Sequence, residues 1–389
     1  MIRHLPVLLV ISLLTCSVEV DISVPSFPDI SDYFVISDGL TQMTIALNFL
    51  GFCISSAFYG PLSDFYGRRK VMLVGNAIMA IGAFGCAIAN TIELLLLARF
   101  IQGLGASTSA VVAFAVIADS YSAKKAASLI GTMNSMITVC MSMAPVAGGF
   151  INEVVGWRGN YITIAIISII SWVMLYYWLP ETKKDITAFN HKKIINDFKR
   201  LLTNRTFICA SITPSIIFAG WMSFVACGAF LYTETYDLPI MHYALHQGSI
   251  IAVFSFVSLH CGRINNLIGM GNSVKYGTLL ILIGSIMLIA VSLLFAKAPY
   301  LTSLAMIIYG IGAAITYPVI FAKSLDIFPD IKGTASSAIM SMRALLCAGF
   351  IALFKLFLSR IPFFSSSIGT DYRSFSSVID NKVACNSDV

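Results

Sequence analysis

Four ionisable side chains lie inside long apolar stretches of this sequence. They are Glu19, Asp21, Arg99 and Arg343. A charge at membrane depth is costly, and the few that occur usually pair with one another or line an ion or substrate pathway. A carboxylate in such a place can bind and release a proton, and a neighbouring guanidinium changes how readily it does so. These residue types therefore indicate movement of protons or small solutes across a membrane.

Two of the acids are close together in the sequence but point in different directions. At a helical rise of 1.5 Å per residue, Asp21 and Arg99 are both about 6–9 Å from the outer ends of their apolar stretches. A pair between them is therefore geometrically possible. Glu19 and Asp21 are about 200° apart around a helix, so both cannot face one cavity without local unwinding. The alternative is that these carboxylates extend to the membrane surface and carry no proton.

The composition requires that membrane-spanning helices position these residues. The chain has 389 residues, 58% hydrophobic and 11% charged, whereas soluble domains carry about 25% charged residues. This excludes a soluble enzyme, a disordered chain and a secreted disulfide scaffold. The nine cysteines include no Cys-x-x-Cys pair, and the five histidines have no acid or nucleophile arranged around them. We therefore expect no metal, no cofactor and no catalytic residue.

Eleven apolar stretches are long enough to cross a bilayer as helices, for which about 20 residues are needed. They are 5–24, 43–62, 71–90, 94–118, 128–151, 160–179, 207–232, 244–260, 276–296, 299–322 and 333–357. With the N-terminus inside, the inner loops hold seventeen Lys and Arg residues, whereas the outer loops between spans hold Arg158 and Lys297. This asymmetry predicts a cytoplasmic N-terminus. The net charge of +6 therefore reflects membrane orientation and not nucleic-acid binding.

The order of the spans predicts an all-α polytopic membrane protein built from two bundles. We expect a six-helix bundle at 1–179, a basic cytoplasmic linker at 180–206, a five-span bundle at 207–358 and a polar tail at 359–389. Two bundles joined by a long inner linker are typical of transporters in which the bundles rock around a central site.

The short turn after the second span contains a recognisable motif. It includes Gly60, Asp64, Gly67, Arg68 and Arg69. The pattern resembles the loop signature of the major facilitator superfamily, G-x-L-x-D-x-x-G-R-R/K, in which glycine suits a tight turn. The resemblance implies that these five residues form a conformational latch, with Asp64 near the start of the eleventh span. The alternative is an ordinary basic inner loop.

Two further spans carry the same resemblance. The fourth span contains Arg99 and Gln102 in a pattern similar to the superfamily motif R-x-x-Q-G. The fifth contains Pro145, Gly148 and Gly149, similar to the antiporter motif G-P-x-x-G-G, although Ala replaces its first glycine. Glycine and proline also allow neighbouring helices to approach closely, which is the structural alternative for this motif.

The end of the first span, from Asp21 to Pro28, resembles the Bcr/CflA drug-resistance transporters. That group exports drugs in exchange for protons. The resemblance implies that Asp21 is the proton-coupling acid, with Glu19 the less favoured candidate and Arg99 adjusting the acid. It also implies a multi-pass protein of the bacterial inner membrane.

Several polar or flexible side chains are candidates for the substrate cavity. They are Gln102, Asn48, Asn134, Arg343 and Met136. We expect a monomer whose partners are protons, lipid and a small amphipathic drug. Two other hypotheses remain open: a transporter that takes up a nutrient or metabolite, and a truncated membrane protein that does not transport.

The hypothesis of a truncated protein that does not transport arises because the family has twelve spans, whereas no run after residue 358 approaches 18 apolar residues. The segment 359–389 is rich in serine and contains charges, which would cost several kcal/mol in hydrocarbon.

We therefore predict that residues 359–389 do not cross the membrane. Because the eleventh span would end outside, a small tag placed after Val389 should be accessible from the periplasm in intact cells. Accessibility is measured with an impermeant reagent, with a tag placed before Met1 as the protected control. Labelling of the C-terminal tag from the cytoplasmic side alone would demonstrate a twelfth span.

Overall fold

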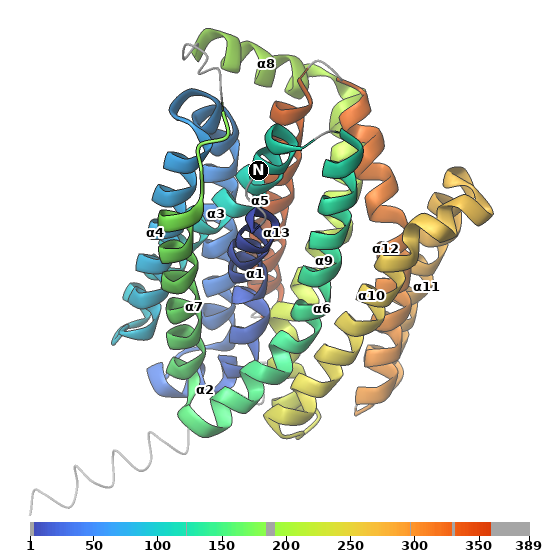
Figure 1. Ribbon diagram of the computed structural model, residues 1–389. Helices are drawn as coiled ribbons and strands as arrows, with labels where there is room; N and C mark the ends of the chain where they lie inside the picture. The colour runs from blue at the N-terminus through green and yellow to red at the C-terminus, as the bar shows by residue number, and fades with distance from the viewer. Residues whose placement is uncertain (1–3, 122, 184–190, 296, 329–330, 359–389) are drawn as a thin grey trace, which may run out of the picture.

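The computed structural model of the protein describes residues 4–121, 123–183, 191–295, 297–328 and 331–358. These residues form α-helices and two short irregular helical turns, and no strand occurs among them (Figure 1). The order is α1(Leu5–Ser23), η1(Val24–Ser26), α2(Phe27–Phe34), α3(Asp38–Tyr66), α4(Arg68–Ala87), α5(Ile92–Ser120), α6(Ala123–Val155), α7(Trp157–Trp178), α8(His191–Thr203), α9(Arg205–Phe230), η2(Leu231–Thr235), α10(Ile240–Ile268), α11(Met270–Leu294), α12(Pro299–Asp326) and α13(Lys332–Leu358).

The structure confirms the eleven expected spans within the described residues, because eleven helical segments are long and apolar enough to cross a membrane. Five of the spanning helices, α3, α5, α6, α10 and α13, begin before and end after the expected apolar stretches, since a helix continues into the polar region beyond the hydrocarbon. The first span is composite and runs through α1, η1 and α2 to Phe34. Pro25 and Pro28 each lie at the start of one of its later pieces, where a missing N–H costs little.

The linker contains a helix that the sequence analysis did not anticipate. Helix α8 lies at the end of the molecule opposite α2 (Figure 1). Its Leu201 is fully buried in a small apolar cluster with Phe207 and Phe328. The helix is amphipathic, so this buried face attaches the linker to the ends of α9 and α13.

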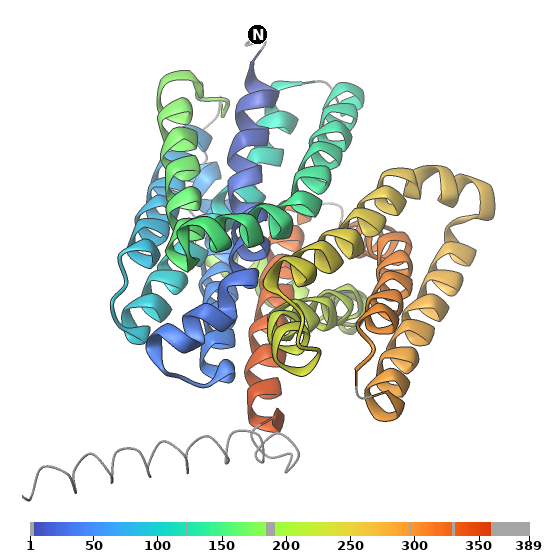
Figure 2. The same cartoon turned by 90° about the horizontal axis from the view of Figure 1, so that it is seen from below.

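The spans form two groups that the view from below separates (Figure 2). We call α1–α7 the N-terminal bundle and α9–α13 the C-terminal bundle. Within the first, α5 packs against both α3 and α4, and α7 packs against α1 and α4. A Cβ atom at Gly103 of α5 would lie 1.9 Å from the carbonyl oxygen of Asn48. Only glycine therefore permits the approach of α5 to α3 at this point.

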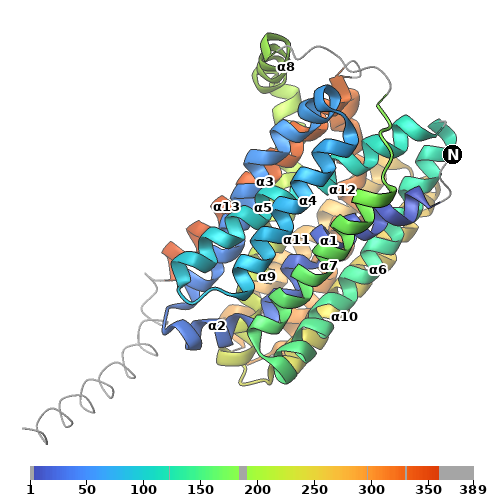
Figure 3. The ribbon, with the colours of Figure 1, turned by 60° about the vertical axis from the view of Figure 1, so that its left-hand side comes forward.

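Two helix pairs join the bundles. Helix α13 runs beside α3 (Figure 3), and the hydroxyl groups of Ser56 and Ser341 are hydrogen bonded at 2.7 Å. Helix α10 packs against α6, where the Ser255 hydroxyl donates to the Thr138 carbonyl at 3.0 Å. The expected tail at 359–389 lies outside the described residues, so its topology stays a prediction.

Candidate functional site

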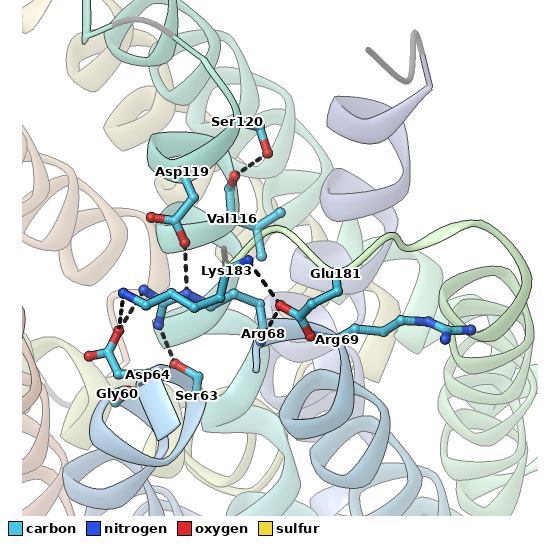
Figure 4. Close-up of polar contacts among 10 residues, drawn as sticks. All are labelled: Gly60, Ser63, Asp64, Arg68, Arg69, Val116, Asp119, Ser120, Glu181 and Lys183. Atoms are coloured by element: carbon cyan, nitrogen blue, oxygen red, sulfur yellow. Dashed lines mark hydrogen bonds and ion pairs between the residues drawn. The ribbon is translucent and has the colours of Figure 1, made fainter. Parts of the chain in front are cut away.

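Polar contacts around the turn between α3 and α4 are drawn in Figure 4. The turn itself is built around Gly67. Its φ angle is +93°, in a region that side chains with a Cβ rarely adopt. A Cβ at this position would also lie 2.3 Å from Oε2 of Glu181. Glycine is therefore required twice, once for the backbone angle and once for the space that the Glu181 carboxylate occupies.

Arg68 is the central cation of this site. Its side chain is 8% exposed and forms ion pairs of 2.8 Å with Asp64 and 2.9 Å with Asp119 of α5. Its Nη1 also donates to the Ser63 hydroxyl. Because a buried guanidinium needs most of its donors satisfied, these three partners fix the end of α3 against α5.

Glu181 holds the beginning of α4. Its carboxylate accepts hydrogen bonds from the backbone N–H groups of Arg68, at 2.9 Å, and Arg69, at 3.2 Å. These N–H groups have no partner within the helix, and the N-terminal end of the helix dipole favours an anion. The Arg69 guanidinium reaches the carbonyl of Tyr176 at 2.7 Å. The segment after α7 is thereby joined to the turn.

Asp64 takes part in two ion pairs at this site. Its carboxylate pairs with Arg68 and, at 3.3 Å, with Lys183. The contact with α13 comes from Gly60, one turn earlier, where a Cβ would lie 3.0 Å from Oγ of Ser337. The five motif residues are therefore gathered at one place, and the charged ones contact α5, α7 and the start of the linker.

Sequence reasoning missed Asp119, Glu181 and Lys183. The first two are acidic residues at the inner ends of spans, where basic residues dominate. That contrast is a signal for ion pairing that could have identified both.

A second site joins Glu19 to Arg99 through Asn48. The Asn48 amide donates to Oε1 of Glu19 and to the backbone carbonyl of Arg99, both at 3.3 Å. All three side chains are 2% exposed or less. No direct ion pair joins Glu19 to Arg99 in this described region, but the two charges lie within electrostatic reach.

The Arg99 guanidinium is enclosed by further groups of the N-terminal bundle. Its Nη1 donates to Oε1 of Gln102 at 2.9 Å. Its charge lies 5.6 Å from the centre of the Tyr161 ring, in cation–π geometry. The motif R-x-x-Q-G thus has a physical role here: Gln102 accepts one hydrogen bond from the arginine, and the following glycine allows α3 to approach.

Asp21 does not pair with Arg99, and this corrects the expected geometry. Asp21 is 2% exposed, and its Oδ1 has no partner among the described residues. The ionisable group with which it interacts is Tyr243 of α10, in the other bundle. The offset of about 200° between positions 19 and 21 explains the difference, since it directs Glu19 toward Arg99 and Asp21 toward α10.

The antiporter-motif glycines lie beside Asp21. A Cβ at Gly148 would be 2.1 Å from the carbonyl oxygen of Ile22 on α1, and one at Gly149 would be 2.8 Å from Cβ of Ala244 on α10. Asn160 of α7 also donates to the Gly148 carbonyl at 3.1 Å. Helix α6 therefore contacts α1 with one glycine and α10 with the next.

The expected cavity residues separate into different places. Asn48 and Gln102 are enclosed in the Arg99 network, whereas Met136 is half exposed. Arg343 donates to the Tyr317 hydroxyl at 2.8 Å, and its guanidinium lies 4.5 Å from the centre of the Phe218 ring. The side chain of Asn134 lies outside the described residues.

A cavity of about 660 Å³ lies elsewhere, between α10 and α12. His246, Tyr300 and Ser303 are among its lining residues, and none of the five expected cavity residues lines it. Arg343 lies beside a bundle contact, because Phe218 of α9 also packs edge-on against Phe49 of α3, with ring centres 6.3 Å apart.

Comparison with known proteins decides the family. A family model described as Major Facilitator Superfamily matches residues 9–351. The chain belongs to the Major Facilitator Superfamily. This confirms the resemblance noted in the sequence, and it confirms that the protein is a transporter-family member and not an enzyme.

Within the superfamily, similar curated proteins include drug-resistance transporters. The chloramphenicol resistance protein CraA of Acinetobacter baumannii is 26% identical over 336 residues, which cover 86% of this chain and 81% of CraA. The multidrug transporter MdfA of Yersinia pestis is 26% identical over 289 residues, covering 72% and 68%. A bicyclomycin resistance protein homolog of Haemophilus influenzae is 24% identical over 338 residues, covering 83% and 82%.

Solved structures confirm the fold of this superfamily member. A bacterial homolog of the human lysosomal transporter Spinster, inward-facing and unoccupied, superposes with a TM-score of 0.74 at 17% identity, covering 96% of this chain and 86% of its own. The partially occluded, inward-open xylose transporter XylE of E. coli gives a TM-score of 0.71 at 16% identity, covering 91% of both chains.

We predict that Asp64→Asn slows transport without preventing folding. The substitution removes two ion pairs of a half-exposed carboxylate but leaves Arg68 its contact with Asp119, so the buried guanidinium keeps an anion. Asp119→Asn in addition should reduce the yield of folded protein, because an uncompensated buried charge costs about 3–5 kcal/mol.

Transport rate and the yield of monodisperse protein are measured for both variants. Glu93→Gln, which changes an exposed carboxylate at the start of α5, is the matched control. Parent-like transport by Asp64→Asn would contradict a latch at this turn.

Proposed function

We propose that the protein exports small amphipathic drugs across the bacterial inner membrane in exchange for protons. The observation that carries this proposal is the pair of buried carboxylates in the first span, one enclosed within a bundle and one directed at the other bundle. The names of the three relatives, which are drug-resistance or multidrug proteins, support the substrate class. The gathering of the antiporter-motif glycines beside Asp21 supports exchange over uptake.

Asp21 is the better candidate for the coupling acid. Glu19, Asn48 and Arg99 all belong to the N-terminal bundle, so a rigid-body movement between bundles leaves their mutual distances unchanged. Asp21 interacts across the bundle boundary with Tyr243, and the same movement changes its surroundings. Coupling requires such a change, because a group whose environment is constant binds protons equally well in both states.

The proposed cycle follows from this difference. Asp21 takes up a proton from the outside when the outer ends of the bundles separate, and releases it to the cytoplasm when they close. The drug moves in the opposite direction. Each proton that enters contributes about 2.3 kcal/mol per 100 mV of membrane potential, in addition to the pH gradient.

Drug accumulation in cells tests this function against its rivals. Cells that lack other exporters and express the protein are loaded with chloramphenicol or with a lipophilic cation. We expect lower accumulation than in cells that express Asp21→Asn. Higher accumulation would indicate uptake, and equal accumulation for a panel of both drug types would indicate a protein that does not transport.

We predict that Asp21→Asn abolishes substrate-induced proton release from the detergent-purified protein while substrate binding is largely kept. The amide preserves the shape of the side chain but cannot carry a proton. Glu19→Gln should retain release, because Glu19 serves mainly as the counter-charge of Arg99. It should bind cationic drugs more weakly than neutral ones, since it removes one negative charge.

Proton release is followed in weakly buffered solution across pH, and binding is measured by tryptophan fluorescence. Undiminished release from Asp21→Asn together with its loss in Glu19→Gln would reverse the two roles. Undiminished release from both would remove the first span from the proton path.

A further inference from the structure

Three buried side chains around the boundary between the bundles have polar atoms without hydrogen-bond partners. Asp21, Tyr243 and Gln247 are each 2% exposed or less. Oδ1 of Asp21, the Tyr243 hydroxyl and both polar atoms of the Gln247 amide have no hydrogen-bond partner among the described residues. Burying such groups unpaired is costly, so a site that retains several of them is built to bind something polar in at least one state.

Tyr243 and Gln247 present their side chains on one face of α10, because residues four apart in a helix lie above one another. Tyr243 lies within electrostatic reach of Asp21, but the described contacts include no direct hydrogen bond between them.

The other ionisable groups near these residues are accounted for. Tyr243 also interacts with Cys227 of α9 and with Tyr232 of η2, whose ring lies 5.6 Å away. The Tyr232 hydroxyl is already bonded to Ser303 and to the carbonyl of Pro299. The Tyr232 hydroxyl therefore already has hydrogen-bond partners, whereas the Tyr243 hydroxyl is able to donate to Asp21.

The groups around α1 act mostly on the other acid. Arg99 of α5 interacts with Glu19, and so does Tyr161 of α7. The ionisable side chains of Cys140 and Glu153 on α6 are exposed. No basic side chain is among the groups described here as acting on Asp21. A hydroxyl or amide donor therefore has a large effect on its proton affinity.

The antiporter-motif glycines set the distance between the two partners. Gly148 contacts Ile22, the residue after Asp21, and Gly149 contacts Ala244, the residue after Tyr243. Both contacts are too close for a larger side chain to fit without displacement. Helix α6 is therefore a thin spacer that allows the α1 acid and the α10 hydroxyl to face one another.

We infer that Tyr243 and Gln247 are positioning residues for Asp21, which donate hydrogen bonds to its ionised carboxylate while α10 is held against α6. When α10 moves away these donors leave, and Asp21 then holds its proton more firmly. The inference rests on the proposed function, in which Asp21 carries the proton. It gives the antiporter motif a physical role, because the two glycines make the proton affinity of Asp21 depend on the position of α10.

The test is the pH at which Asp21 ionises in the purified full-length protein, followed by the infrared band of its protonated carboxyl group. The Asp21→Asn spectrum identifies the band. Tyr243→Phe keeps the ring that packs against Gly228 and removes only the hydroxyl. We expect the midpoint to rise by about one pH unit, which is a tenfold change in proton affinity. Gln247→Leu should shift it in the same direction.

Gly149→Ala supplies an independent variant that leaves both donors in place. Its added methyl group would press on Ala244 and displace α10, so the midpoint should rise here too. Tyr236→Phe is the matched control, because its hydroxyl binds Thr302 and not Asp21, and its midpoint should equal that of the parent. Drug affinity at a pH where Asp21 is fully ionised should be the same in all four variants.

Unchanged midpoints in Tyr243→Phe and Gln247→Leu, or an equal shift in Tyr236→Phe, would overturn the inference. This outcome is separable from failure of the proposed function, because the infrared midpoint needs no drug and no transport. A shift in a protein that exports nothing would uphold the positioning role and reject drug export. Export that depends on Asp21, with no shift of the midpoint in any variant, would uphold drug export and reject the positioning role.

Discussion

The burial of the Arg99 guanidinium is the constraint on which the arrangement of the N-terminal bundle depends. A fully enclosed cation is tolerated only where acceptors and an acid surround it. Gln102 comes from its own helix, the Glu19 charge comes from α1, and Asn48 of α3 joins the acid to the backbone of α5. Gly103 permits this meeting because α3 and α5 touch at backbone distance. One charge thus holds three helices in register.

Because of that constraint, the two acids of α1 have different surroundings. Glu19 lies near Arg99 of the same bundle, so movement between the bundles leaves its surroundings unchanged. Asp21, two residues later, emerges on another side of the same helix and meets the opposite bundle. In the proposed cycle, the network around Glu19 and Arg99 stays unchanged, whereas the surroundings of Asp21 on the same helix change as the bundles move. The regular geometry of α1 up to Ser23 keeps them apart.

The sequence predicted the spans and the motif positions, because these depend on local composition. It did not predict which acid meets Arg99. The prediction compared only the depths of Asp21 and Arg99 along their spans. The rotation of each helix about its axis decides which acid faces the arginine, and depth alone does not give that rotation. The amphipathic α8 was also missed, because its apolar positions are few within a basic segment. Glu181 was missed because its role depends on the return of the chain after α7 to a turn more than a hundred residues earlier.

The two bundle contacts differ in their chemistry, and this difference constrains how the bundles can move. Between α3 and α13 the contact includes paired hydroxyl groups, which can exchange partners with water as they part. Between α6 and α10 it includes the hydrogen bond from the Ser255 hydroxyl to the Thr138 carbonyl and, apart from it, the close apolar contact of Gly149 with Ala244. Such an apolar contact resists compression and allows separation or rotation. Movement about α6 would therefore cost little where Gly149 meets Ala244, and it would change the surroundings of the buried polar groups beside that point. Asp21 and Tyr243 occupy that position, so the chemistry of the α6–α10 contact directs the effect of bundle movement onto the carboxylate.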